Sequence, residues 1–276
     1  MFADYHVHTE FSDDSAYPME QVVKDAIAMK MDEICFTDHV DYGIKEDWDY
    51  SRPAECRRGK GPMNVDYPRY FALLKELQHK YDGQITIRTG LEFGMQTHTI
   101  PQYQTLQETC PLDFVILSVH QVEDREFWTQ DFQRNRSQKE YNERYYEEIL
   151  ELVKAYQDYS VLGHLDLIVR YDKNGVYPFE KIREVVSEIL KIVIADGKGI
   201  EFNTSFRRYG LQDTTPSVDI LKLYRELGGE LITIGSDSHA PAHLGAGILE
   251  AKQLLKDLGF GYFCTYDNQK PLYHTL

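Results

Sequence analysis

The segment Phe114-Val-Ile-Leu-Ser-Val-His120 shows the pattern on which the fold depends, because a short apolar, β-branched run ends in a histidine. Apolar runs of about four to eight residues bounded by polar ones are typical of strands buried on both faces. The same pattern recurs along the whole sequence. Seven such segments are predicted to be strands: Phe2–His8, Glu33–Thr37, Ile85–Leu91, Phe114–Val119, Ser160–Leu165, Gly199–Asn203 and Leu231–Gly235.

Longer amphipathic segments separate these strands. Helices are predicted at Met19–Met29, Pro68–Lys80, Gln138–Tyr156, Phe179–Ala195, Ser217–Leu227 and His243–Leu258. Strands that alternate with helices indicate βαβ units and a parallel sheet. Seven units in one uninterrupted chain favour an α/β fold of the TIM-like barrel type, closed or nearly closed. A doubly wound open sheet is the alternative.

The domain organisation follows from length and composition. A chain of 276 residues could form two domains, but a single barrel commonly reaches about 250 residues. Because no low-complexity or proline-rich linker divides the chain, residues 1–276 are predicted to form one domain. Two long polar segments, Asp41–Asn64 and Gln121–Ser137, are predicted to be loops over one end of the barrel, where function is often located.

The charge balance restricts the partners. The chain has 45 acidic and 30 basic residues, which gives a net charge of −15. Binding to nucleic acids or to acidic membranes depends on Lys and Arg, so both classes of partner are disfavoured. Metal cations and small ligands remain compatible with this charge. The oligomeric state is left open.

The localisation is expected to be cytoplasmic. The first residues, MFADYHVHTEFS, contain no basic and apolar segment of the secretory type, and no apolar run is long enough to cross a bilayer. The four cysteines are isolated and form no C-x-x-C pair, which is typical of reduced thiols.

Polar side chains with metal-binding chemistry follow the predicted strands. In a parallel barrel all carboxyl ends of the strands lie on one rim, so residues far apart in sequence converge there. The residues at these ends are His6, His8, Asp38, His39, Glu92, His120, His164, Asn203, Asp237 and His239.

Residue spacing strengthens the prediction of a metal site. Side chains two apart in a strand share a face, which groups His6 with His8 and Asp237 with His239. Imidazole and carboxylate are good ligands for zinc, iron or manganese. A single histidine at a strand end is more often structural than a ligand. Six such histidines, in a chain of ten, are difficult to explain by packing, and they exceed what one tetrahedral ion requires.

Motifs for other chemistries are missing. The sequence has no P-loop, no G-x-S-x-G nucleophile motif and no H-E-x-x-H pair. Gly245-Ala-Gly247 lacks the third glycine of a dinucleotide-binding fingerprint.

The ordered set of motifs resembles that of the polymerase and histidinol phosphatase (PHP) superfamily, and the layout is most similar to its histidinol-phosphatase branch. The matching motifs span nearly the whole chain: His6-Val-His8-Thr, Thr37-Asp38-His39, Gly90-Leu-Glu92, Ser118-Val-His120, Gly163-His164 and Gly235-Ser-Asp237-Ser-His239.

This resemblance implies a distorted seven-stranded barrel with three divalent metal ions, which would be zinc, iron or manganese. The implied ligands of the three ions are, in turn, His6, His8, Glu92 and Asp237; Glu92 again with His120 and His164; and His39, His239 and Asp14. Many relatives have histidine where Asp14 stands, so this chain departs from that version of the pattern. Aspartate is an acceptable oxygen donor, and Asp13 is the alternative ligand.

The resemblance also implies hydrolysis of a phosphate monoester by water activated between divalent ions. Arginine can offset the negative charge of the phosphate, and the candidates are Arg170, Arg207 and Arg208. Glu92 and Asp237 are the catalytic carboxylates, and Arg170 and Arg207 the catalytic arginines. The proton for the leaving alkoxide could come from a coordinated water, Asp237 or His243, which is also a candidate substrate-binding residue.

The substrate implied by this branch is L-histidinol phosphate, which makes histidine biosynthesis the implied pathway. Two alternatives remain open from the sequence. The first is another phosphoesterase or an exonuclease of the same superfamily. The second is a catalytically inactive metal-binding module, although every implied ligand position carries a side chain capable of binding a metal.

Overall fold

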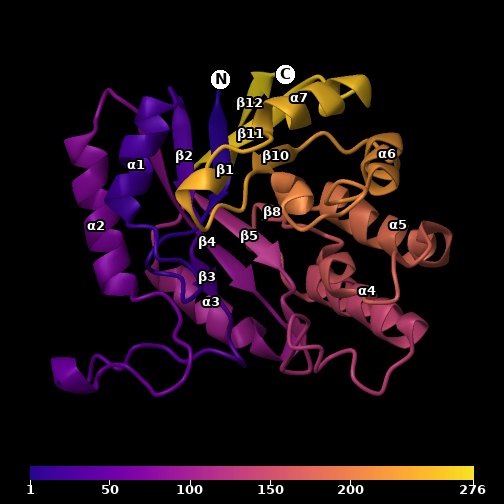
Figure 1. Ribbon diagram of the computed structural model, residues 1–276, viewed down its shortest axis with the longest axis horizontal. Helices are drawn as coiled ribbons and strands as arrows, with labels where there is room; N and C mark the ends of the chain where they lie inside the picture. The colour runs from indigo at the N-terminus through magenta and orange to yellow at the C-terminus, as the bar shows by residue number, and fades with distance from the viewer.

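Seven parallel strands form the centre of the molecule in the computed structural model, which describes residues 1–276 (Figure 1). In their order across the sheet they are β1 (Ala3–Val7), β2 (Glu33–Phe36), β4 (Thr86–Gly94), β5 (Phe114–Ser118), β8 (Val161–Leu162), β9 (Gly199–Asn203) and β10 (Ile232–Gly235). The short β3 (His39–Val40) pairs with β4 beyond the end of β2. All seven predicted strands are therefore present.

The sheet curves until its first and last strands meet. A parallel bridge joins Val7, at the end of β1, to Ser238, which follows β10. The Ser238 carbonyl accepts from His8 N at 2.8 Å, and Ser238 N donates to the His6 carbonyl at 3.1 Å. The buried Asp4 carboxylate spans the same seam by accepting from Ser236 N at 2.8 Å. The sheet is therefore a nearly closed, distorted barrel, which confirms the fold prediction and rules out the open doubly wound sheet.

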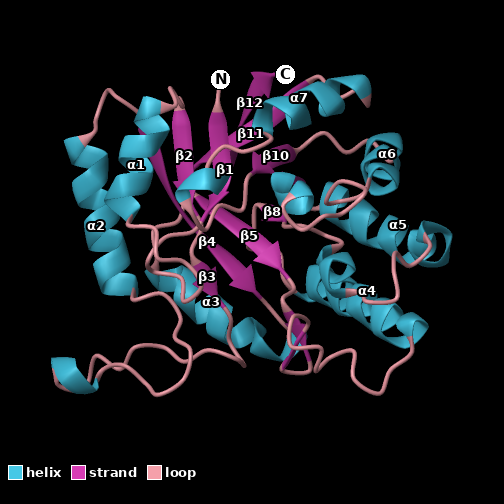
Figure 2. Ribbon diagram, in the orientation of Figure 1, coloured by secondary structure: helices cyan, strands magenta, loops and turns pink.

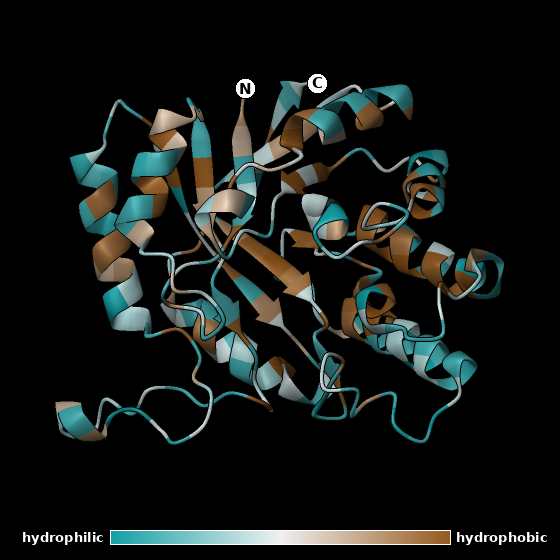
Figure 3. Cartoon of the chain, viewed as in Figure 1, coloured by the Kyte–Doolittle hydropathy of each residue, from teal (hydrophilic) through white to brown (hydrophobic).

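Seven helices flank the strands (Figure 2). They are α1 (Met19–Ala28), α2 (Tyr67–Lys80), α3 (Ile100–Thr109), α4 (Gln138–Ala155), α5 (Phe179–Ala195), α6 (Val218–Glu226) and α7 (Ile248–Asp257). Each packs an apolar stripe inward, as Val22, Val23 and Ala26 do in α1. Figure 3 shows the result as hydrophobic central strands and hydrophilic outward faces of the helices.

Several boundaries differ from the predictions for local reasons. Strand β4 continues to Gly94, so Glu92 lies within a strand rather than after it. The last helix begins at Ile248 and not at His243, because Gly245 and Gly247 adopt positive φ and end the preceding turn. Helix α3, with Pro101 in its first turn and a weak apolar stripe, was not predicted.

Two hairpins were also missing from the predicted elements. Strands β11 (Tyr262–Asp267) and β12 (Lys270–Thr275) form an antiparallel pair at the amino ends of the barrel strands. Strands β6 (Gln121–Val122) and β7 (Arg125–Glu126) form a smaller one inside the second polar segment. Tyr266 N, from the first hairpin, donates to the Tyr5 hydroxyl of β1 at 2.8 Å. The β11–β12 hairpin therefore closes the end of the barrel opposite the rim.

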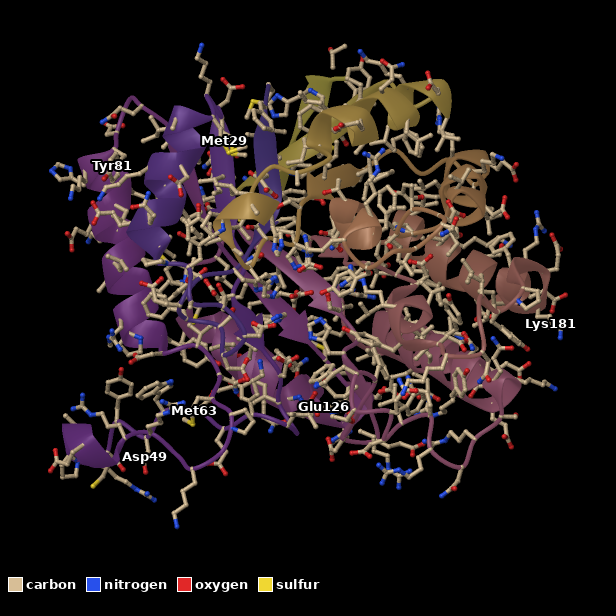
Figure 4. All side chains as sticks on the ribbon, viewed as in Figure 1. Met29, Asp49, Met63, Tyr81, Glu126 and Lys181 are labelled. Carbon is tan, nitrogen blue, oxygen red and sulfur yellow. The ribbon has the colours of Figure 1, made fainter.

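The polar segment from 41 to 64 extends away from the body as a loop, as predicted, and carries only a short 3-10 helix, η1 (Ala54–Cys56). Figure 4 labels Asp49 and Met63 on this loop. Its two ends are joined where Asp41 N donates to the Asn64 side chain at 2.9 Å. The loop therefore starts and ends at the rim of the barrel. No helix of the chain combines the length and the apolar character needed to cross a membrane.

Candidate metal centre

Glu92 lies at the centre of the rim and is completely buried. Its Oε2 atom is 3.1 Å from His6 Nε2, 3.5 Å from His8 Nε2 and 3.0 Å from His39 Nδ1. His6 lies in β1, His8 follows the end of that strand, and His39 begins β3. One carboxylate oxygen is thus surrounded by three imidazole nitrogens.

The other oxygen of Glu92 faces a second pair of histidines. Glu92 Oε1 is 3.1 Å from His120 Nε2 and 2.8 Å from His164 Nε2. It also accepts from the Ser118 hydroxyl at 2.7 Å, which fixes the orientation of the carboxylate. Glu92 therefore joins two groups of histidines through its two oxygens.

Asp237 closes the first group from the opposite side of the barrel seam. Its Oδ1 atom is 3.8 Å from His6 Nε2, 3.6 Å from His8 Nε2 and 3.5 Å from His239 Nδ1. The backbone of Asp237 has a φ of +55°, a left-handed conformation unusual for a non-glycine residue. Such strained positions concentrate at functional sites.

Asp14 forms a third group at the edge of the cluster. Its Oδ2 atom is 3.4 Å from His39 Nε2 and 3.1 Å from His239 Nε2, and its side chain is half exposed. The alternative residue, Asp13, points elsewhere and pairs with Lys45 Nζ at 2.6 Å. All nine residues proposed as metal ligands are therefore brought together, and Asp14 rather than Asp13 is adjacent to the histidines.

The geometry of these atoms fits divalent cations. His6 Nε2, His8 Nε2, His39 Nδ1 and Glu92 Oε2 are buried and have no hydrogen-bond partner. Buried polar atoms are nearly always partnered, so four unpartnered atoms around one point indicate a missing partner. Ligand atoms bound at about 2.1 Å to one ion stand roughly 3–3.5 Å apart, close to the separations observed here.

Neighbouring side chains aim the imidazoles at this point. His6 Nδ1 is 2.5 Å from Glu201 Oε1, His120 Nδ1 is 2.7 Å from Asp41 Oδ1, and His8 Nδ1 is 3.3 Å from Ser12 Oγ. These contacts hold one ring nitrogen of each histidine and leave the other as a ligand atom. The Glu201 carboxylate also accepts from His164 N at 2.8 Å, so it positions two of the histidines.

Both central carboxylates are held in the charged form. Burial raises the pKa of Glu92, but attraction from His6, His120 and His39 outweighs it and lowers the pKa well below its usual range. Burial likewise raises the pKa of Asp237, and attraction from His6 and Arg170 reverses the effect. The centre therefore presents negative oxygens at neutral pH.

Glu201 and Asp41 were missed by the sequence reasoning. Glu201 lies inside the buried β9, where it is the one charged residue, and this lone carboxylate was the available signal. Asp41 was counted among the loop residues. Its own partner, Lys45 Nζ at 2.8 Å, belongs to the same loop.

Three of the four residues predicted to bind the substrate lie near Asp237. Arg170 lies in the 3-10 helix η3 (Leu167–Tyr171), and its Nη1 donates to Asp237 Oδ2 at 3.0 Å. Arg208 Nη2 donates to the Asp237 carbonyl at 2.7 Å. His243, in the 3-10 helix η5 (Pro241–His243), has its pKa lowered by burial and by Arg208.

Arg207 is the exception. It is exposed and lines a different cavity, between η4 (Thr204–Arg207) and α7, together with Phe206 and Glu250. The turn of η4 directs consecutive residues to different sides, so Arg207 points away while Arg208 points toward Asp237. The structure does not bring Arg207 to the cluster.

A cavity of about 320 Å³ opens over the cluster and is lined by His39, His120, His164, Arg170, Asp237 and His239. Its outer wall contains Pro62 from the first polar loop and Glu126 and Trp128 from the second, with Glu126 labelled in Figure 4. Both loops therefore lie at the rim, as predicted. The cavity has the size of a small-molecule site.

Known proteins are similar to this chain in sequence and in fold. Residues 4–205 match the family model described as "PHP domain". The histidinol-phosphatase of Lactococcus lactis subsp. lactis is 32% identical over 97% of this chain and 95% of its own length. The histidinol-phosphatase of Bacillus subtilis is 26% identical over 88% of this chain and 95% of its own length.

Two solved structures extend the comparison. The crystal structure of histidinol phosphate phosphatase from Lactococcus lactis, complexed with zinc, L-histidinol and phosphate, superimposes with a TM-score of 0.84 at 30% identity, over 98% of both chains. A structure from Listeria monocytogenes, at 22% identity, covers 90% of this chain and 99% of its own, and its TM-score of 0.71 shows the same fold. The family match and these similarities show that the chain belongs to the PHP domain family.

Proposed function

We propose that residues 1–276 act as one catalytic domain, a metal-dependent phosphomonoesterase that hydrolyses L-histidinol phosphate to L-histidinol and phosphate in cytoplasmic histidine biosynthesis. One observation carries the proposal. The two oxygens of Glu92 contact two groups of histidines, and members of both groups line a cavity together with Arg170. The similarity to the histidinol-phosphatase of Lactococcus lactis supports this choice of substrate.

The centre is proposed to hold three divalent ions, which would be zinc, iron or manganese. The overlapping groups around Glu92, Asp237 and Asp14 support more than one ion, because His6, His8 and His39 each face more than one carboxylate. When bound, the ions supply Lewis acidity toward water and toward the phosphate oxygens.

Arg170 is proposed to bind the phosphate. Its guanidinium is fixed by Asp237 and donates through Nη2 to Asn203 Oδ1 at 3.1 Å and Ser205 Oγ at 2.7 Å. Its Nε and one N–H of Nη1 have no partner, so the guanidinium keeps donors for a ligand of the cavity that it lines. A guanidinium fixed in advance stabilises the charge of the transferred group without reorganisation.

Arg208 and His243 are proposed to complete this side of the site. Arg208 holds the strained Asp237 backbone through its carbonyl, and His243 lies close enough to Arg208 for its pKa to respond. Glu92 and Asp237 hold the metal cluster and so position the catalytic groups. Arg207 is left out because it lies in another cavity.

The outer part of the cavity suits a cationic leaving group. Glu126 contributes a carboxylate to the wall, and Trp128 and Tyr171 contribute aromatic faces. L-Histidinol carries an ammonium group and an imidazole ring, which these side chains can receive. The small volume of the cavity and the net charge of −15 support a small phosphate ester over a nucleic acid.

Phosphate release from a panel of substrates tests the proposal. The panel contains L-histidinol phosphate, other monoesters, a phosphodiester and single-stranded DNA, and elemental analysis is made on the same preparation. We expect L-histidinol phosphate to have the highest kcat/KM and the protein to contain about three metal equivalents. Faster cleavage of DNA or of another ester would show that L-histidinol phosphate is not the substrate. A protein that contains metal but releases phosphate from none of these compounds would be a metal-binding module and not an enzyme.

A further inference from the structure

A second cavity lies on the other side of η3 from the metal cavity. It has a volume of about 190 Å³ and lies between α4, η3, the start of α5 and the segment preceding α6. Leu167, Arg170 and Tyr171 of η3 line the metal cavity, whereas Ile168 and Val169 of the same turn line the second one. The two cavities therefore share one wall and differ in their lining.

Two buried polar groups in this lining lack partners. Asp166, only 5% exposed, accepts from Ser217 N at 2.8 Å through Oδ2, while its Oδ1 atom has no hydrogen-bond partner. The hydroxyl of Tyr177, a residue 7% exposed, is also without a partner. Burying a polar group without a hydrogen bond is unfavourable, so both groups favour a ligand that supplies hydrogen bonds.

The charges in the lining have one sign. Asp166, Asp213 and Asp219 line the cavity, and no Lys, Arg or His does. Lys181 approaches from outside, with Nζ 5.4 Å from the centre of the Tyr177 ring, and lies at the periphery of the molecule (Figure 4). Burial raises the pKa of Asp166 to about 7, and a cation bound beside it would favour its charged form. A cation is therefore favoured in this cavity, and an anion would face the carboxylates of Asp213 and Asp219.

Most of the remaining lining is apolar. Nine of the sixteen lining residues are hydrophobic, among them Tyr146, Ile168, Ile182 and Leu211. A cavity with apolar walls and a few convergent polar groups is the usual form of a small-molecule site. Val176 also lines it and is 71% exposed, which places it at the mouth.

We propose that this cavity binds a small organic cation that has one ammonium group, an apolar or aromatic body and no anionic group. The ammonium donates to Asp166 Oδ1, the Tyr177 hydroxyl supplies a second polar contact, and the body packs against the apolar wall. An amino acid is a poorer ligand than the corresponding amine, because its carboxylate would be repelled by Asp213 and Asp219. This site is separate from the proposed phosphatase site.

Calorimetric titration of the metal-loaded protein with 2-phenylethylamine tests the proposal. Saturating inorganic phosphate is present to occupy the phosphate-binding part of the metal cavity. Because the outer part of that cavity also suits an aromatic amine, the variants described next decide which cavity binds the amine. We expect one equivalent of the amine to bind. The matched neutral compound 2-phenylethanol and the zwitterion phenylalanine should bind at least about tenfold more weakly, since each lacks the favourable charge pattern. No binding of the amine, or equal binding of the alcohol, overturns the proposal.

Two variants locate the binding. Asp166→Asn keeps an acceptor for Ser217 N but removes the charge, and should weaken binding of the amine at least about tenfold. Val176→Lys adds a cation at the exposed mouth and should weaken binding severalfold, while the uncharged Val176→Gln should stay within twofold of the wild type. If Asp166→Asn does not fold, Val176→Lys decides the question.

Wild-type affinity in Val176→Lys, or in a folded Asp166→Asn, overturns the assignment to this cavity. Phosphate release from L-histidinol phosphate is measured in parallel and should be unchanged in Val176→Lys. Failure of the proposed phosphatase function would appear in that second assay alone.

Discussion

The two ends of the barrel differ in whether their buried polar groups have hydrogen-bond partners. At the carboxyl end, His6 Nε2, His8 Nε2, His39 Nδ1 and Glu92 Oε2 converge without hydrogen-bond partners. At the amino end, the buried carboxylate of Glu33 has its partners within the protein. Glu33 accepts from the Tyr5 hydroxyl and from Arg88 Nε at 3.2 Å.

Asp113, also at the amino end, has a hydrogen-bond partner for each of its carboxylate oxygens. Its two oxygens accept from Thr89 N at 2.9 Å and from Asn268 N at 3.0 Å, and Asn268 belongs to the turn of the β11–β12 hairpin. A satisfied network stabilises the fold, whereas an incomplete one requires an external partner. The amino end should therefore control stability and the carboxyl end activity.

The strongest test of this division is Glu92→Ala. The substitution removes the one carboxylate that contacts both groups of histidines, so we expect kcat/KM to fall at least about a thousandfold, more than the loss of an outer partner costs. Metal content, measured by elemental analysis, should fall with it. Normal turnover and normal metal content in a folded Glu92→Ala protein would show that the rim is not a metal centre.

Glu201→Gln tests the carboxylate that positions two of the candidate metal ligands. Because Glu201 holds His6 Nδ1 and His164 N, we expect kcat/KM to fall about 10–100-fold. Metal affinity should fall as well, and added metal should restore part of the activity. The matched control is Glu33→Gln at the amino end, for which kcat/KM should be unchanged. Equal loss of activity in the two variants would contradict the conclusion that only the carboxyl end of the barrel controls activity.

Asp14 tests the exposed edge of the cluster. We expect Asp14→Ala to lower kcat/KM about tenfold and to remove up to one equivalent of metal, since the residue touches only His39 and His239. Asp14→His supplies another metal-binding side chain at the same place, so it should retain most of the activity and most of the bound metal. If Asp14→Ala behaves as the wild type, the third ion is not required.

Arg88→Ala should have the smallest effect on activity. The substitution leaves the buried Glu33 without its cation, which should lower the free energy of unfolding by about 1–3 kcal/mol. Thermal unfolding measures this loss, and kcat/KM measured below the transition should match that of the wild type. A large loss of activity without a loss of stability would place function at the amino end as well.

The strands and the convergence of the candidate ligands could be predicted from sequence because both depend on local signals. Apolar runs such as Phe114–Ser118 mark buried strands, and the barrel rule then brings together the residues at their ends. The charged partners could not be predicted in this way. Glu201 and Asp41 act through contacts with His6 and His120, from segments remote in sequence, and only the assembled barrel shows those contacts.

The two neighbouring arginines show a second limit of prediction from sequence. Arg207 and Arg208 are adjacent in sequence and equally basic, yet only Arg208 reaches Asp237. The direction of a side chain in a single 3-10 turn is not encoded in residue type or periodicity. The β11–β12 hairpin was missed for a related reason, because the exposed β12 lacks a regular apolar alternation.

The seam between β1 and β10 has a consequence for the synthesis of the protein. His6 leaves the ribosome early, but Asp237 and His239, which complete its surroundings, follow more than 230 residues later. A nascent chain that ends before β10 has most of the imidazoles and an unpaired edge on β1, the kind of edge that promotes association between chains. Completion of the candidate metal centre is therefore an event of the finished chain, and a prematurely terminated product cannot assemble it.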